Sequence, residues 1–216
     1  MKRTMALPSV IFVLLLFGCT REAGILSTSH NRIIALQPID HYVINDLESF
    51  QRELGNFYHT QVIVLKPIPI PESFFNRAVQ KYSADSMVSL LSKIAGENNE
   101  EVIGITYFEL YTIKDGKKGM QPYFDEDIFG LGYLPGNACV VSDIKLRTIN
   151  SAVFNNRLRN VIIHEVGHNM GLQHCSDTAC IMSEANGGFP ALDKKGMDYC
   201  NKCKRELLKL HAVFIK

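Results

Sequence analysis

The stretch from His164 to His174 constrains this chain more than any other, because it reads H-E-x-x-H-x-x-G-x-x-H. His164 and His168 are four residues apart, so a helix places both imidazoles on one face, where they can reach a single metal ion. Gly171 can adopt a positive φ, which ends the helix and turns the chain so that His174 reaches the same ion. Three nitrogen ligands leave a fourth position for water, which is the coordination of a catalytic zinc.

Glu165 gives this predicted metal site a chemical role. It follows the first histidine directly, so its carboxylate can reach a metal-bound water without being a ligand, and it can act as a general base. The residues themselves leave one alternative class open, a non-hydrolytic zinc module that binds peptides or partners. The carboxylate favours the enzyme, because a purely structural zinc site has no use for it.

The pattern continues beyond the third histidine with four cysteines and a methionine, at Cys175, Cys180, Met182, Cys200 and Cys203. The whole string, H-E-x-x-H-x-x-G-x-x-H-C-x₄-C-x-M-x₁₇-C-x-x-C, resembles that of the archaemetzincin family of zinc metalloproteases, within the metzincin group. The resemblance is specific over residues 164–203 and continues more loosely over nearly all of the chain after about residue 30.

The resemblance implies a peptidase with two zinc ions. The three histidines would hold the catalytic ion, and a tight turn at Met182 would lie beneath it. The four cysteines, Cys175, Cys180, Cys200 and Cys203, would hold a second, structural ion with tetrahedral geometry. Their spacing independently suits such a site, because each short-spaced pair can bind from one loop. The alternative is a different zincin in which these four cysteines form two disulfides.

Metzincins often place a tyrosine just after this methionine to stabilise the oxyanion of the transition state. The residues Ser183-Glu184-Ala185 contain none. Tyr199 is a distant candidate for the role.

The N-terminus predicts export. Residues 1–18 combine a basic start with an apolar segment of about a dozen residues, which is typical of a bacterial signal peptide. The segment Leu16-Phe17-Gly18-Cys19 resembles a lipobox, so we expect a lipid on Cys19, a tether over residues 19–30, and a lipid-anchored enzyme in the cell envelope. A secreted or periplasmic enzyme is the alternative. An uncleaved membrane span is disfavoured, because the apolar run is shorter than the roughly 18 residues that a span needs.

Export bears on the cysteines, because an oxidising compartment favours disulfides over thiolates. Cys139 lies in an apolar run and is predicted to be a buried strand residue. The other four cysteines after Cys19 are even in number, so parity does not separate zinc from disulfides. The complete spacing match favours zinc.

Composition limits the classes of molecule that this protein is expected to bind. The formal net charge is +1, and the chain has no basic stripe and no aromatic stacking platform, which argues against nucleic acid. We therefore expect a peptide or protein substrate and a monomeric enzyme. Residues 31–216 are long enough for one domain with a proper core.

Helical and strand patterns alternate along this domain, which predicts a mixed, mostly parallel sheet backed by helices, as in the zincin fold. An N-terminal subdomain (31–171) would carry the sheet and active-site helix, and a smaller C-terminal subdomain (172–216) the third histidine, Met182 and the cysteines. Residues 114–136 are expected to form a long loop with room for an edge strand. Helices are predicted over 40–54, 83–95, 154–170 and 202–213, and strands over 32–36, 61–65, 101–108 and 139–142.

Overall fold

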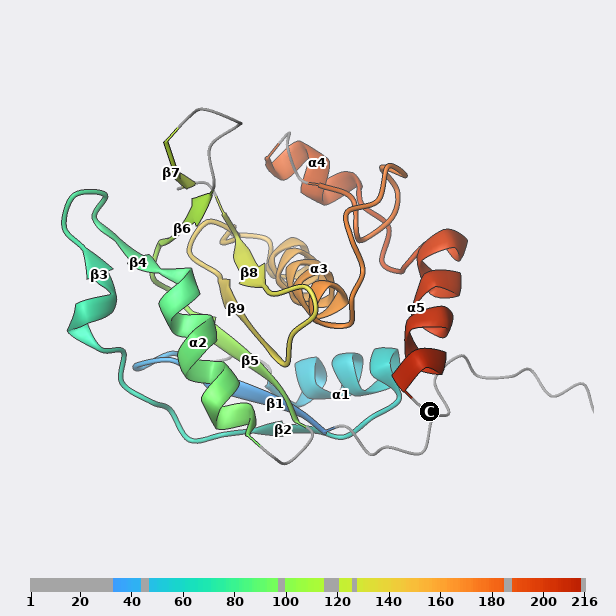
Figure 1. The fold of residues 1–216 in the computed structure, drawn as a ribbon, viewed down its shortest axis with the longest axis horizontal. Coiled ribbons are helices and arrows are strands. Elements are labelled where there is room, and N and C mark those ends of the chain that lie inside the picture. The colour runs from blue at the N-terminus through green and yellow to red at the C-terminus, as the bar shows by residue number, and fades with distance from the viewer. Residues whose placement is uncertain are drawn as a thin grey trace, which may run out of the picture.

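The computed structural model describes residues 33–43, 47–96, 100–114, 121–125, 128–184 and 188–214. The predicted signal segment, Cys19 and the tether lie outside these ranges. Within them, a twisted sheet runs through the middle of the molecule with helices on both of its faces (Figure 1). None of the described helices combines the length and apolarity needed to cross a membrane.

The main sheet has five strands in the order β2-β1-β5-β9-β8. The first four are parallel and β8 is antiparallel to β9, so the predicted mixed, mostly parallel sheet is confirmed. β8 is an edge strand, which matters for the site described below. The bounds are β1 Ile33–Pro38, β2 Val62–Val64, β5 Glu100–Thr106, β8 Gly130–Gly132 and β9 Ala138–Ser142.

The sheet has a helix layer on each face (Figure 1). Helix α2 (Ala84–Ala95) covers one face, and helices α1 (Leu47–Tyr58) and α3 (Ser151–Asn169) cover the other. Successive strand residues point to opposite faces, so Val102 packs toward α2 while Ile103 packs toward α1 and α3. Because both faces are buried, the central strands are largely apolar and show no regular alternation with polar residues.

Both predicted boundaries of the first helix are wrong, each for a tertiary reason. The first helix begins at Leu47, well after the predicted Asp40, because Asp40 has a φ of 59° and its N–H donates to Ile68 O. It also continues through Gly55 to Tyr58. Gly55 is there to allow a close approach, since a Cβ at this position would lie 3.1 Å from Thr60 O.

The segment 114–136, predicted as a long loop with room for an edge strand, contains two short strands. One is β8, and the other is β7, which belongs to a second sheet with the order β3-β4-β6-β7. Three-residue strands are too short to show a periodic pattern, and glycine disfavours strands locally, so only pairing with neighbours reveals them. The bounds in this sheet are β3 Phe75–Asn76, β4 Lys81–Ser83, β6 Leu110–Lys114 and β7 Tyr123–Asp125, with a 3₁₀ turn at Glu72–Phe74.

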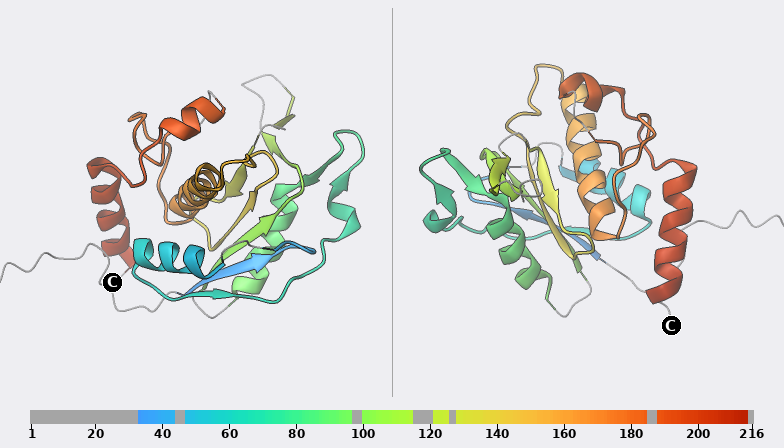
Figure 2. Two further views of the ribbon diagram at one scale, coloured as in Figure 1. Left: turned by 180° about the vertical axis from the view of Figure 1, so that it is seen from behind. Right: turned by 45° about the horizontal axis from the view of Figure 1, so that its top comes forward.

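The C-terminal segment lies on the same side of the sheet as α3 (Figure 2). It contains helix α5 (Asn201–Phe214), which matches its prediction, and helix α4 (Phe189–Lys194), which the sequence did not predict. The active-site helix α3 begins at Ser151, one turn before the predicted Phe154. Asn150 explains the earlier start, because its side-chain oxygen accepts from the N–H groups of Ala152 and Val153.

Candidate zinc-peptidase site

Helix α3 carries two of the three histidines and the glutamate on its last turns. The helix ends after Asn169, and Gly171 has a φ of 97°, in the left-handed region that favours glycine. The chain then reverses, and His174 approaches from outside the helix. The Nε2 atom of His168 lies 3.1 Å from Nε2 of His164 and 3.2 Å from Nε2 of His174.

The tautomers of these histidines follow from what their Nδ1 atoms contact. Nδ1 of His164 lies 2.8 Å from Ile181 O, and Nδ1 of His168 lies 2.8 Å from Leu172 O. A carbonyl oxygen only accepts, so each Nδ1 carries the proton and each Nε2 keeps its lone pair. Nδ1 of His174 is held in the same way by Glu184 Oε1 at 2.7 Å.

Three nitrogen lone pairs therefore converge on one point, which is an arrangement that needs a cation. Zinc–nitrogen bonds of about 2.0–2.1 Å in a tetrahedral site separate two nitrogens by roughly 3.3 Å, close to the two separations given above. Burial also lowers the pKa of His164 to about 3, so this imidazole is neutral at physiological pH, as a ligand must be. The geometry fits a three-histidine zinc site.

Glu165 is buried against the edge strand β8. The N–H of Gly132 bonds its carboxylate, and a Cβ at Gly130 would lie 2.9 Å from its Cγ, so both glycines let the strand approach the helix. Burial raises the pKa of Glu165 to about 8, although the Gly132 bond and the charge of Lys195 act in the opposite direction. A carboxyl group with a raised pKa is suited to accept a proton and return it.

A cleft of about 580 Å³ joins these groups. Its walls come from β8, from α3 and from the segment after the third histidine, and the three histidines and Glu165 all line it. Met182 lies behind them in a tight turn in which Ser183 N–H donates to Cys180 O at 3.0 Å. A Cβ at Gly167 would overlap Met182 Sδ, so this glycine of α3 makes room for the methionine.

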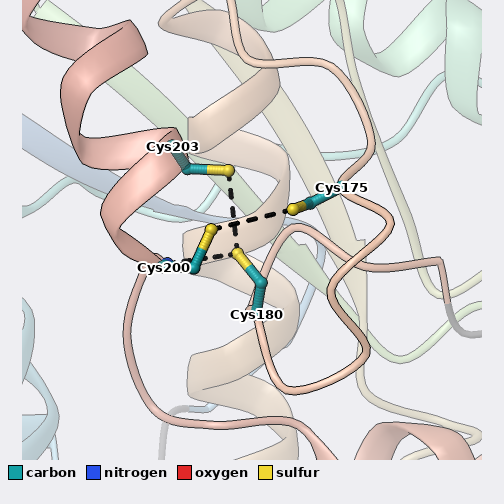
Figure 3. A group of neighbouring side chains, drawn as sticks. All are labelled: Cys175, Cys180, Cys200 and Cys203. Carbon is teal, nitrogen blue, oxygen red and sulfur yellow. Dashed lines mark hydrogen bonds between the residues drawn. The ribbon is translucent and has the colours of Figure 1, made fainter.

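The four cysteines Cys175, Cys180, Cys200 and Cys203 form a separate cluster (Figure 3). The first two lie on the loop after the third histidine, and the last two lie at the start of α5. Their sulfurs are 3.7 Å apart in the pairs Cys175–Cys200 and Cys180–Cys203. Zinc–sulfur bonds of about 2.3 Å in a tetrahedron separate sulfurs by roughly 3.8 Å, whereas a disulfide bond is about 2.05 Å long. The cluster therefore has the dimensions of a four-thiolate zinc site.

Tyr199, the predicted candidate for oxyanion stabilisation, does not line the cleft. It is buried, and its hydroxyl donates to Ile163 O at 3.0 Å. It stacks edge-on against Phe57 and helps to seat α3 against α1.

The structure places two further residues at the site, Glu184 and Lys195, that no sequence pattern predicted. Glu184 supports His174, and Lys195 is buried in the cleft wall. Neither residue is part of a recognisable sequence motif. A histidine that binds zinc through one nitrogen commonly donates from the other nitrogen to a carboxylate. An acidic residue shortly after the third histidine could therefore have indicated Glu184.

Comparison with known proteins gives a consistent result. A family model described as Peptidase family M54 matches residues 30–209. The archaemetzincin of Haloquadratum walsbyi is 33% identical over 164 residues, which cover 71% of this chain and 87% of that protein. In the fold, the crystal structure of archaemetzincin from Methanopyrus kandleri superposes with a TM-score of 0.71 at 24% identity, covering 87% of this chain and 99% of that one. Archaemetzincin from Archaeoglobus fulgidus, complexed with malonate, gives 0.66 at 25% identity over 81% and 99%.

Replacement of Glu184 tests its support of His174. Glu184→Ala removes the acceptor for Nδ1, so we expect zinc affinity at the histidine site to fall by about 10–100-fold, while the cysteine site keeps its ion. Competitive titration with a zinc chelator measures the change. Glu206→Ala, on α5, is the control and should leave affinity unchanged. Equal affinities in all three proteins would remove Glu184 from the site.

Chelation should separate the two metal sites. We expect two zinc ions per purified chain, and mild chelation should remove the histidine-bound ion first, because three neutral ligands and water hold zinc less tightly than four thiolates. Metal analysis counts the ions, and circular dichroism should show the fold retained after the first loss. A native protein with one zinc per chain and no free thiol beyond Cys139 after denaturation would contradict the four-thiolate site.

Proposed function

Because the chain belongs to peptidase family M54, the archaemetzincins, it is a zinc metallopeptidase, and we propose that it hydrolyses peptide bonds with Glu165 as the general base. The observation that carries this proposal is the convergence of three Nε2 lone pairs in one cleft with a buried carboxylate. His164, His168 and His174 would hold the catalytic zinc, and the four cysteines would hold a structural one. When bound, the catalytic ion activates water and polarises the scissile carbonyl.

The protein's own residues account for the proton transfers. Glu165 takes a proton from the attacking water on its carboxylate and later gives it to the nitrogen of the leaving amine. Gly132 N–H keeps the carboxylate oriented through both steps. Met182 fills the space behind the histidines and keeps Ile181 O in place for Nδ1 of His164.

The edge strand β8 supplies a surface for an extended peptide. Its inner edge pairs with β9, and within the described residues no strand pairs with its outer edge. All three residues of β8 line the cleft beside Glu165. We propose that the substrate backbone adds to this edge as a further strand, with the scissile bond held over the histidines. The cleft then separates the proposed subdomains 31–171 and 172–216.

Replacement of Glu165 separates the enzyme from a peptide-binding zinc module. In Glu165→Gln the histidines stay in place, so the histidine site should still bind one zinc ion. Peptidase activity should fall by at least the 10²–10⁴-fold expected for the loss of a general base. His168→Ala should instead lose the ion. A library of short fluorogenic peptides and metal analysis give the two readouts. Full activity in Glu165→Gln on any peptide that the unaltered protein cleaves would refute the mechanism.

We further propose that the enzyme is a monomer anchored to a membrane of the cell envelope through a lipid on Cys19. The lipid anchor rests on the sequence of residues 1–19 alone. A tether of about 11 residues averages roughly 18–20 Å end to end as a random coil, which lets the domain lie just above the bilayer. Its substrates would then be exported or envelope peptides.

Detergent phase partitioning tests the anchor. The full-length protein should enter the detergent phase at a reduced apparent mass, because the signal is removed and the lipid added, whereas Cys19→Ala should not. If both proteins stay in the aqueous phase without residues 1–18, the enzyme is secreted without a lipid. If both keep those residues, the apolar segment is an uncleaved anchor.

A further inference from the structure

Lys195 has a backbone position that the active-site helix itself fixes. It follows directly after α4, and α4 is tied to α3 by Arg157, which donates two hydrogen bonds of 2.6 Å to Asp193. The guanidinium also lies 4.6 Å above the ring of Phe189. Arg157 lies two turns before His164 on the same face of α3. The placement of Lys195 is therefore coupled to that of the histidines.

The side chain of Lys195 points inward. The residue is 9% exposed, and its Nζ donates to Ile181 O at 3.4 Å and to Ser183 O, the two carbonyls on either side of Met182. Ile181 O is also the acceptor for Nδ1 of His164. The ammonium is thus one shared acceptor away from a zinc ligand.

Lys195 is a buried cation on which the charges of Glu165 and Glu184 act without a direct ion pair. An ammonium has three N–H groups, and two of them meet the carbonyls above. Within the described residues, no carboxylate forms an ion pair with Nζ. Burial of an ammonium group that has no hydrogen-bonded carboxylate is costly. The residue lines the same cleft as Glu165 and the histidines, and an ammonium group that makes two hydrogen bonds keeps a third N–H with which it can donate to an anion.

We propose that Lys195 is a second cationic group of the catalytic cleft and that its ammonium stabilises the negative charge that develops on the scissile carbonyl oxygen. This inference rests on the proposed peptide hydrolysis. As water attacks, the carbonyl π pair moves onto oxygen. As that oxyanion collapses, the C–N bond breaks and the amine takes its proton from Glu165. Fixed positive charge aimed at this oxygen lowers the barrier. Lys195 would thus stabilise the oxyanion in place of Tyr199, which does not line the cleft.

Two anionic oxygens could meet this ammonium, the transition-state oxyanion or a carboxylate at the end of the substrate. We commit to the oxyanion, because Lys195 lines the same cleft as Glu165 and the three histidines, where the reacting atoms would lie. A ligand carboxylate would make the enzyme selective for the C-terminus of peptides, and this is an outcome that the experiment separates.

The experiment compares the zinc-loaded full chain with Lys195→Met, Lys195→Arg and the control Lys194→Met. Lys194 is the exposed neighbour of Lys195, so its replacement removes the same charge outside the cleft. Zinc content and thermal unfolding confirm that each variant is folded. Two probes are used. The first is a phosphonamidate tripeptide, which mimics the tetrahedral anion, and its affinity is measured by calorimetry. The second is a tripeptide that ends in either a carboxylate or an amide. Its binding is measured in the Glu165→Gln background, with and without each lysine replacement, so that it is not cleaved.

We expect Lys195→Met to lower kcat by about 10²-fold, as for the loss of one oxyanion donor, with KM within threefold. Phosphonamidate affinity should fall at least tenfold, while both ground-state peptides bind as before. Lys195→Arg should restore part of the loss, and Lys194→Met should match the unaltered protein. A loss confined to the carboxylate-ended peptide would overturn the assignment in favour of terminal carboxylate binding.

Other outcomes separate this inference from the proposed function. Hydrolysis that depends on Glu165 but is equal in Lys195→Met and Lys194→Met refutes the role of Lys195 and leaves the peptidase intact. If the unaltered zinc-loaded protein and Glu165→Gln are equally inactive on every peptide, the proposed function fails. Loss of zinc or of folding in both Lys195 variants, with Lys194→Met normal, makes Lys195 a structural residue and overturns the proposal.

Discussion

Three imidazole nitrogens with their lone pairs turned toward one another impose the main constraint on this structure. The Nε2 atoms lie 3.1 and 3.2 Å apart, and lone pairs that face one another at such distances repel unless a cation lies between them. The protein enforces this arrangement by giving the opposite nitrogen of each ring an acceptor, two of them backbone carbonyls that cannot reorient. The segment after α3 therefore orients the histidines, because Ile181 O and Leu172 O belong to that segment.

Close approach between elements is the second requirement. Glycines on β8 and α3 lie where a Cβ would overlap Glu165 or Met182. Each of these contacts brings a chemically important side chain against a rigid element. The glutamate is buried as a result, and burial is the main cause of its raised pKa. The same lack of side chains leaves the backbone of the edge strand open toward the cleft.

The cysteine cluster ties the C-terminal segment together directly beside the catalytic site. Cys175 follows His174 in the chain, and Cys180 begins the turn that carries Met182. An ion held by these thiolates would fix the loop that delivers the third histidine and the carbonyl behind the first. The two sites are thus mechanically connected through fewer than ten residues, with α5 as the outer support.

The sequence by itself determined the local parts of this protein. Helical periodicity places His164, Glu165 and His168, and the conformational freedom of glycine at Gly171 allows the turn, so an eleven-residue motif was enough to predict the metal site. Apolar periodicity likewise gave α2 and the buried strands. Only the tertiary structure decided which distant groups complete the site. Lys195 meets carbonyls 12 and 14 residues away, and β8 lies against α3 because of strand pairing that three glycine-rich residues do not signal. Contacts of this kind depend on where backbone carbonyls and neighbouring strands end up in space, and no spacing in the chain encodes that position.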